Sequence, residues 1–208
     1  MLFWTVKQNR RTMNKIILTD CDGVLLNWEE SFHQWMTQKG YNKVRHATYD
    51  LAAAYDLHRE NQHDVVREFN ASAWMCCLPQ FRDSMSGVAR LTEAGYRFDV
   101  ITSLGLDPYA KKLRQQNLDT VFGKTPWNSL TCLDTAADKD EALEPYRDTG
   151  LWWIEDLPKN CEAGLKVGLK PILITHDHNE DYYNPDVVRV KNWNEIANMI
   201  LDDVDDAA

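Results

Sequence analysis

Residues 15–26, KIILTDCDGVLL, join a short apolar run to a pair of aspartates. The β-branched segment 14–19 predicts a fully buried strand, and Asp20-Cys21-Asp22-Gly23 follows it as a turn. In a parallel sheet, ligands bind beyond the carboxyl ends of the strands. Asp20 and Asp22 are therefore expected at a binding edge, although Asp-x-Asp-Gly is also common turn chemistry.

Downstream of this turn, segments of helical period alternate with short apolar runs. The expected helices cover 28–40, 85–95, 109–117, 140–147, 159–168 and 194–201, and the expected strands cover 98–101, 121–122, 151–154 and 171–175. Strands that alternate with helices of about ten residues favour βαβ units around a parallel sheet. The predicted fold class is α/β, with a Rossmann-like parallel sheet flanked by helices and a small helical cap.

The stretch from residue 41 to residue 78 is polar and helical and shows no convincing strand. We expect residues 27–78 to form the helical cap, and residues 13–26 and 79–203 to form the core. Residues 1–12 are expected to be an N-terminal tail and residues 204–208 an acidic C-terminal tail.

The overall composition excludes several classes of function. The chain has 23 basic and 32 acidic residues, a formal net charge of −9, so no basic surplus is available for a nucleic acid polymer or an anionic membrane. No apolar window is long enough to cross a bilayer, and the first residues do not resemble a signal peptide. The five cysteines show no C-x-x-C spacing, which favours a reducing, cytoplasmic setting.

Other polar residues occupy the ends of the later strands. Thr102-Ser103 follows the second strand, and Glu155-Asp156 follows the run LWWI, with Lys139 on the helix that precedes it. Clustered carboxylates are tolerated when a cation compensates them, and an oxygen-only set of this kind suits Mg²⁺. A lysine and a hydroxyl beside them could hold a phosphoryl group, and Gly23 would allow the backbone to approach it.

Four segments in this order resemble the motifs of the haloacid dehalogenase superfamily of phosphohydrolases. ILTDCDGVLL resembles the first motif, DVITS the second, Lys139 the third and IEDLPKN the fourth, over residues 15–196. The residues around these motifs are similar to those of the small 5′(3′)-deoxyribonucleotidases. The departures are Glu155 where an aspartate is common and Asn160 where a further aspartate often stands.

The resemblance implies a role for each motif residue. Asp20 would be the nucleophile that forms an aspartyl-phosphate, and Asp22 the general acid and base. Thr102, Ser103, Lys139 and Gly23 would bind the substrate phosphate. Asp20, the main-chain carbonyl of Asp22 and Asp156 would ligate Mg²⁺, with Glu155 and Asn160 in support.

Two choices at this site have alternatives. Lys124 and the pair Lys111-Lys112 also lie between the second and fourth motifs, but Lys139 is preferred because it begins the helix that leads into LWWI. His176-x-His178 could be a metal pair, yet its polar surroundings favour a solvated loop over a zinc site.

The chain contains eight tryptophans, which could serve as core or as a wall for a ligand. Trp28, Phe32, Trp35 and Trp74 lie in or beside the expected cap, where an aromatic face could stack on a base. Core packing is the alternative use for each of them.

The predicted function is a Mg²⁺-dependent phosphomonoester hydrolase that acts through an aspartyl-phosphate. Its partner would be a small phosphorylated metabolite, with (deoxy)nucleoside 5′-monophosphates favoured, and its state a monomer or a homodimer. The alternatives are a phosphatase of another small metabolite and a non-catalytic binding protein on the same fold.

Overall fold

The computed structural model describes residues 15–45, 48 and 50–205. The expected tail over 1–12, the start of the first expected strand at Asn14, and residues 206–208 lie outside the described residues. The described chain forms a six-stranded sheet in the order β3-β2-β1-β4-β5-β6. All its neighbouring strands are parallel. The strands are β1 (Ile16–Thr19), β2 (Arg97–Thr102), β3 (Trp127–Cys132), β4 (Trp152–Glu155), β5 (Lys170–Ile174) and β6 (Val188–Val190).

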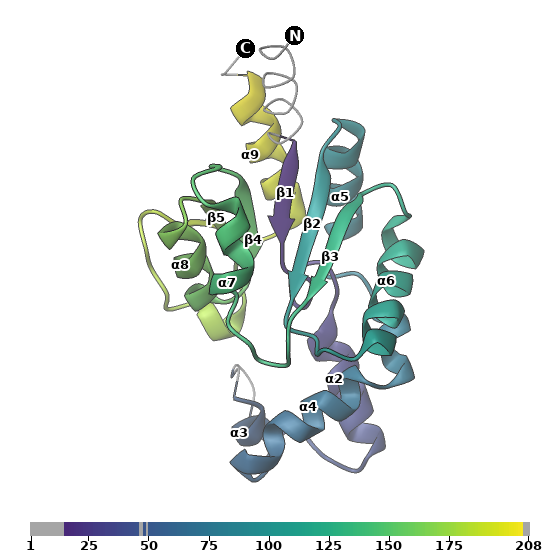
Figure 1. Cartoon of the computed structure of the whole chain (residues 1–208). Helices are drawn as coiled ribbons and strands as arrows, with labels where there is room; N and C mark the ends of the chain where they lie inside the picture. The colour runs from purple at the N-terminus through teal and green to yellow at the C-terminus, as the bar shows by residue number, and fades with distance from the viewer. Residues whose placement is uncertain (1–14, 46–47, 49, 206–208) are drawn as a thin grey trace.

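Helices cover both faces of the sheet and the region beyond its carboxyl edge (Figure 1). They are α2 (Trp28–Gln38), α3 (Leu51–Tyr55), α4 (Gln62–Asn70), α5 (Ser84–Glu93), α6 (Pro108–Phe122), α7 (Asp140–Leu143), α8 (Pro158–Lys166) and α9 (Trp193–Asp205). Short 3-10 turns stand at η1 (Arg59–Asn61), η2 (Ala73–Cys76), η3 (Glu144–Tyr146) and η4 (Asp177–Asn179). This is the predicted Rossmann-like α/β architecture.

Alternation along the strands divides the core in two, because successive side chains of a strand point to opposite faces of the sheet. Ile17 joins the larger cluster, which α5, α6 and α9 cover. Leu18 joins the second cluster, which contains Trp153 and is covered by α7 and α8. Both side chains have no exposed surface, as expected for a parallel sheet with two covered faces.

Helices α2, α3 and α4 lie beyond the carboxyl ends of the strands, at the bottom of Figure 1. The chain leaves the core and returns to it at neighbouring points. The amide of Asn27 donates to the carbonyl of Pro79 at 2.8 Å, and Leu26 forms an antiparallel bridge with Gln80. On α6, Asn117 donates to the Leu78 carbonyl at 2.9 Å and accepts from the Leu78 amide at 3.0 Å. The stretch that carries α2, α3 and α4 is thus tied to the core at both of its ends.

Several expected element boundaries are wrong. Residues 121–122 are the last turn of α6 and not a strand, and the third strand lies at Trp127–Cys132. The helix expected over 140–147 ends as α7 at Leu143, because Pro145 cannot continue it and a 3-10 turn follows. Strand β6 was not expected, and α9 runs through Asp205 into the segment assigned to the acidic tail.

Every helix in the described part of the chain is too short or too polar to cross a lipid bilayer.

Candidate active site at the carboxyl edge of the sheet

Lys139 lies between two carboxylates at the carboxyl edge. Its ammonium nitrogen is 2.7 Å from Asp20 Oδ1 and 2.7 Å from Glu155 Oε1. Burial lowers the pKa of Lys139, but Asp20 and Glu155 outweigh this effect and leave the pKa above its usual range. Lys139 therefore stays protonated and supplies one buried positive charge beside Asp20.

The Glu155 carboxylate is fully enclosed, with no exposed surface. Oε1 accepts from Lys139 and, at 2.8 Å, from Asn160 Nδ2, while Oε2 accepts from the amides of Asp156 and Leu157 at 3.0 Å. A carboxylate with all of these donors is a structural anchor. Glu155 fixes Lys139 and the turn that carries Asp156, and Asn160 acts on the site through Glu155.

Asp156 lies beside Asp20 and Glu155, and oxygens of these three carboxylates are within 4.8 Å of one another. Burial raises the pKa of Asp156 well above its usual value, and the charges of Glu155 and Asp20 raise it further. Gly23 makes room for this carboxylate: it has a φ of +75°, and a Cβ there would lie 2.6 Å from Asp156 Oδ2. The amide of Gly23 itself donates to Leu26 at 2.9 Å.

Asp22 forms a bidentate ion pair with Arg114, a residue that the sequence analysis did not single out. The Arg114 side chain has no exposed surface, whereas 25% of the Asp22 side chain remains exposed. Burial raises the pKa of Asp22, and Arg114 opposes this rise. Arg114 also donates to Cys21 Sγ at 2.9 Å and to Met75 Sδ at 3.1 Å.

A signal for Arg114 exists in the sequence. Its neighbours on α6 at helical spacing, Ala110, Asn117 and Leu118, are all buried, so Arg114 lies on the core-facing side of the helix. A charged residue on such a face needs a partner.

Thr102 and Ser103 follow β2 and line the same cavity as Asp20. Thr102 is 1% exposed. The Ser103 hydroxyl donates to the carbonyl of Ala137 at 2.9 Å, which ties the end of β2 to the loop before Lys139. In this arrangement the Ser103 hydroxyl proton is already used within the protein.

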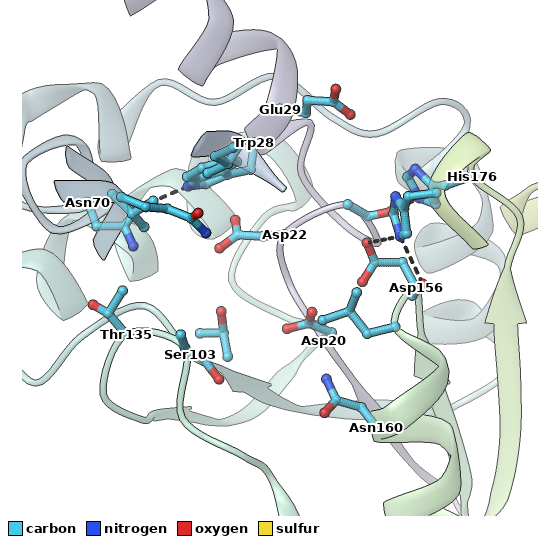
Figure 2. Close-up of a pocket in the computed structure, with 18 of the residues that line it drawn as sticks. Asp20, Asp22, Trp28, Glu29, Asn70, Ser103, Thr135, Asp156, Asn160 and His176 are labelled. Carbon is cyan, nitrogen blue, oxygen red and sulfur yellow. Dashed lines mark hydrogen bonds and ion pairs between the residues drawn. The ribbon is translucent and has the colours of Figure 1, made fainter. Parts of the chain in front are cut away.

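A cavity of about 240 Å³ opens between the carboxyl edge and the helices α2 to α4. Figure 2 shows Asp20, Asp22 and Asp156 on its core side, with Trp28 and Asn70 across from them. The Trp28 indole N–H donates to Asn70 Oδ1 at 2.9 Å, and Asn70 Nδ2 donates to the Leu104 carbonyl at 2.8 Å. One wall of the cavity therefore carries acidic side chains and the facing wall an aromatic ring that is fixed in place.

The other three aromatic residues considered for the cap wall do not line this cavity. Phe32 and Trp35 are buried in the main core, where Phe32 stacks on Trp28 with ring centres 4.5 Å apart. Trp74 packs against that core from η2. Helical spacing placed these residues on one apolar face but did not tell which part of it meets the cavity.

Lys139 is the one lysine of the four considered that reaches the carboxylates. Lys111, Lys112 and Lys124 line a separate, shallow depression along α6.

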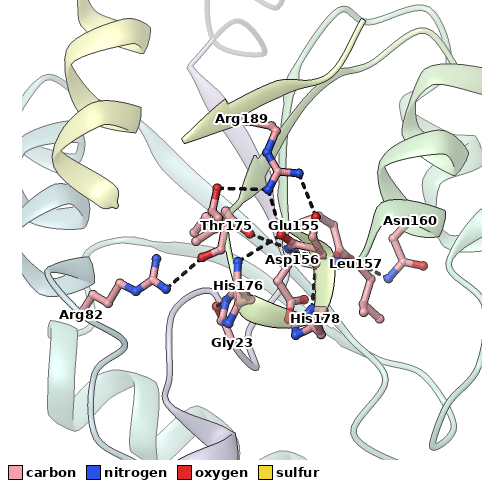
Figure 3. A network of polar contacts seen from close by, with 12 residues as sticks. Gly23, Arg82, Glu155, Asp156, Leu157, Asn160, Thr175, His176, His178 and Arg189 are labelled. Atoms are coloured by element: carbon pink, nitrogen blue, oxygen red, sulfur yellow. Dashed lines mark hydrogen bonds and ion pairs between the residues drawn. The ribbon is translucent and has the colours of Figure 1, made fainter. Parts of the chain in front are cut away.

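The His176-x-His178 segment is not a solvated loop, contrary to the sequence-based expectation. Both rings are partly buried, and His176 stacks on Phe81 with ring centres 4.7 Å apart. His176 Nε2 donates to the Gly23 carbonyl at 2.8 Å, and His178 Nε2 lies 3.2 Å from the Asp156 carbonyl oxygen. Figure 3 shows both histidines beside Gly23 and Asp156. The segment was misjudged because β5 brings it next to β4 only in the folded sheet.

The donor set tests whether Mg²⁺ fits this edge. Asp20 and Asp156 offer buried carboxylate oxygens, and Lys139 is the only cation that contacts Asp20 among the described ion pairs. A hard oxygen set with an excess of negative charge suits Mg²⁺. Asp20 and Asp156 therefore fit the ion. Glu155 would not ligate it directly, because its carboxylate oxygens already accept from four donors in the protein.

Comparison with known proteins supports the fold assignment. No protein-family model matches the chain. A 32.4 kDa protein of unknown function from the Gp30-rIII intergenic region of Enterobacteria phage T4 is 24% identical over 200 residues, which cover 91% of this chain and 70% of that protein.

Solved structures with this fold include a haloacid dehalogenase-like hydrolase from Streptococcus pneumoniae, with 15% identity and a TM-score of 0.64 over 90% of this chain and 99% of that one. CbbY from Rhodobacter sphaeroides in complex with phosphate has 17% identity and a TM-score of 0.58 over 88% and 96%. D,D-heptose 1,7-bisphosphate phosphatase from B. bronchiseptica, with magnesium and phosphate, has 13% identity and a TM-score of 0.59 over 91% and 99%. The chain has the fold of haloacid dehalogenase-like hydrolases.

Proposed function

We propose that this protein is a Mg²⁺-dependent phosphomonoester hydrolase that acts through an aspartyl-phosphate on Asp20. The observation that carries the proposal is the arrangement of Asp20, Lys139 and Asp156 at one edge, with Lys139 2.7 Å from Asp20 and the cavity above them. Solved structures of this fold include CbbY in complex with phosphate and D,D-heptose 1,7-bisphosphate phosphatase in complex with magnesium and phosphate, which supports the same function.

The chemistry begins at Asp20. Lys139 holds Oδ1 of this carboxylate and fixes its orientation. A carboxylate oxygen of Asp20 attacks phosphorus, the bond from phosphorus to the ester oxygen breaks, and the phosphoryl group is left on Asp20. The alcohol part of the substrate departs toward the side of the cavity that Trp28 and Asn70 line.

Asp22 handles the protons of both steps. In its protonated form, which burial favours by raising the pKa and Arg114 opposes, the Asp22 carboxyl can give its proton to the departing alkoxide oxygen. The resulting carboxylate then accepts a proton from the water that attacks the phosphoryl group, which releases phosphate and restores Asp20. Arg114 holds Asp22 through both of its carboxylate oxygens, so side-chain rotation of Asp22 requires this ion pair to open.

Asp20, the main-chain carbonyl of Asp22 and Asp156 would hold Mg²⁺, which supplies positive charge where the phosphate oxygens gather. Lys139 supplies the second positive charge from the protein itself. Thr102 lies at the end of β2 in the same cavity, where its hydroxyl can donate to a phosphate oxygen.

A (deoxy)nucleoside 5′-monophosphate is our favoured substrate class. The partly exposed indole of Trp28 lies across from the acidic wall, backed by Phe32, and offers a flat apolar surface to a base. The second candidate is a phosphorylated sugar. Structures of the same fold favour it, because they include D,D-heptose 1,7-bisphosphate phosphatase and CbbY in complex with xylulose-(1,5)bisphosphate.

Release of phosphate from a generic aryl phosphate, measured with Mg²⁺ and with EDTA, tests the activity. We expect hydrolysis with Mg²⁺, none with EDTA, and none for Asp20→Asn. Lack of activity with every divalent metal tried would overturn the hydrolase assignment, and full activity of Asp20→Asn would overturn the mechanism.

A panel of phosphate esters tests the substrate class. We expect kcat/KM to be highest for nucleoside 5′-monophosphates and to fall for Trp28→Ala with these substrates more than with a small phosphate ester such as phosphoglycolate. A clear preference for sugar phosphates would replace the nucleotide assignment with the second candidate.

A further inference from the structure

We propose that Asp156, His176 and His178 form a second cation site, one that takes a divalent transition metal such as Zn²⁺. One ligand atom from each of the three residues lies within 4.8 Å of the others. The inference goes beyond the proposed hydrolysis and does not depend on it, because it concerns binding of a different ion by a ligand set that shares only Asp156 with the proposed Mg²⁺ site.

The spacing of the ligand atoms fits such an ion. His178 Nε2 lies 3.6 Å from Asp156 Oδ2 and donates to the Asp156 carbonyl at 3.2 Å, so binding of the ion through Nε2 requires the ring proton to move to Nδ1. Two ligands with bonds of roughly 2.0–2.2 Å to one tetrahedral Zn²⁺ lie about 3.4 Å apart. These two atoms are therefore already near the separation that a shared metal ion would require, and His176 supplies the third ligand.

The residues that carry the ligands are held in place. Asn179 Nδ2 donates to the carbonyls of Asp156 and Ile174 at 2.8 Å, so it joins the ends of β4 and β5. Its Oδ1 accepts from the His176 amide at 3.1 Å and from Arg189 at 3.2 Å. Asn179 is 2% exposed, so this clamp is part of the folded core. A site that is fixed before the ion arrives loses little conformational freedom on binding.

The histidines also have the character of metal ligands. A ligand imidazole must be neutral, and it commonly donates its other N–H to a carbonyl group. His176 has such a partner in the Gly23 carbonyl, and its ring is oriented further by stacking on Phe81.

The ligand types select the class of ion. Two imidazoles with one carboxylate suit Zn²⁺ and its neighbours, whereas Mg²⁺ prefers oxygen ligands. Asp156 belongs to both sets, so the two sites are adjacent and share one residue.

Zn²⁺ titration of the full, tag-free chain tests the site, with Kd obtained by competition with a chromophoric chelator and without Mg²⁺. We expect one site, with ¹H–¹⁵N imidazole signals of His176 and His178 that shift on binding. The double variant His176→Gln/His178→Gln should bind at least about 100-fold more weakly, because it lacks two direct ligands and changes in outer residues alone cost 10- to 100-fold.

Two matched controls separate this site from other Zn²⁺ ligands. Cys76→Ser/Cys77→Ser removes a thiol pair with sulfurs 3.1 Å apart, and His58→Gln removes an exposed histidine. Both should bind Zn²⁺ as the parent does. Unchanged binding by the His176/His178 variant, or imidazole signals that do not respond to Zn²⁺ in the parent, would overturn the proposal. If the double variant is unfolded by circular dichroism, the parent's imidazole signals decide.

Discussion

Removal of the Asp22 charge should destabilise the protein more than removal of its partner Arg114. Asp22→Asn leaves a guanidinium with no exposed side-chain surface and no counter-charge. Loss of one partner of a buried ion pair costs about 3–5 kcal/mol. For a chain of this size, such a loss lowers the Tm by roughly 6–20 °C, since each kcal/mol corresponds to about 2–4 °C.

Arg114→Met leaves the opposite remnant, a carboxylate with 25% of its side chain exposed to water. Burial already raises the pKa of Asp22, so loss of Arg114 lets the group take up a proton more readily. The introduced methionine lies beside Met75 and Cys21, which are both fully buried and apolar. We therefore expect a smaller loss, about 1–3 kcal/mol.

The double variant completes the comparison. Asp22→Asn/Arg114→Met has neither charge, so its free energy of unfolding should match that of Arg114→Met alone. The coupling between the two sites then equals the loss in Asp22→Asn, about 3–5 kcal/mol. Urea unfolding followed by tryptophan fluorescence in EDTA measures all four proteins. If Asp22→Asn is no less stable than Arg114→Met, or if the two losses add to within about 0.5 kcal/mol, Arg114 is not held by Asp22.

Four further outcomes are expected. Lys139→Met leaves Asp20 and Glu155 buried without their shared cation. It should abolish hydrolysis and lower the free energy of unfolding, measured in urea, by about 3–5 kcal/mol. Near-parental stability would contradict the ion pairs that Lys139 forms with Asp20 and Glu155. Mg²⁺ at 100 times its Kd should stabilise the parent by about 2.7 kcal/mol and should not stabilise Asp156→Asn. Because protonation of Asp156 opposes Mg²⁺ binding and its pKa is raised, calorimetry should show this stabilisation beginning to fall on acidification at a pH well above the ordinary value of 3.8. A decline that begins only near 3.8 would count against the buried carboxylate cluster. Asn70→Ala removes the hydrogen bond that holds the Trp28 indole, and it should raise KM for nucleotides while KM for a small phosphate ester stays unchanged. An equal rise for both substrates would exclude a role of Asn70 in positioning Trp28. Gly164→Ala should destabilise the protein by about 1–3 kcal/mol in thermal unfolding, because the added Cβ would lie 2.6 Å from Trp153 Cδ1. Alanine alone would favour the helix, so a more stable variant would refute the tight contact of α8 with the sheet.

The acidic residues of the candidate site could be predicted because each directly follows a strand. The sequence shows a strand end at Asp20 and another at Asp156, and parallel strands bring their carboxyl ends to one edge. The sheet order places β1 and β4 side by side, so Asp20 and Asp156 become neighbours. Lys139 was predicted for a different reason, because it begins the helical segment that leads into β4.

Arg114 and the two histidines could not be predicted in this way. The contact between Arg114 and Asp22 joins residues 92 positions apart and depends on how α6 packs against the turn after β1. His176 depends on Phe81, on which its ring stacks, and on Asn179, which accepts a hydrogen bond from its main-chain amide. These contacts follow from tertiary packing, which local patterns do not encode.

The sequence also could not predict which aromatic side chains face the core and which face the cavity. Trp28, Phe32 and Trp35 share an apolar face of α2, and helical spacing places all three together. Whether a given ring meets the core or the cavity depends on how Phe69 packs against all three rings, and Phe69 belongs to a different helix, α4.

The hydrogen bond between Asn27 and Pro79 has a consequence for chain entropy. It closes the loop that contains α2, α3 and α4, and the two core segments on either side of it are already paired at Leu26 and Gln80. The entropy lost in closing such a loop rises only slowly with its length, by about 0.6 kcal/mol for each doubling. Length by itself is therefore a weak constraint on this segment, and residues can be gained or lost between its helices at little entropic cost, provided that Phe32 and Phe69 keep their contacts with the main core.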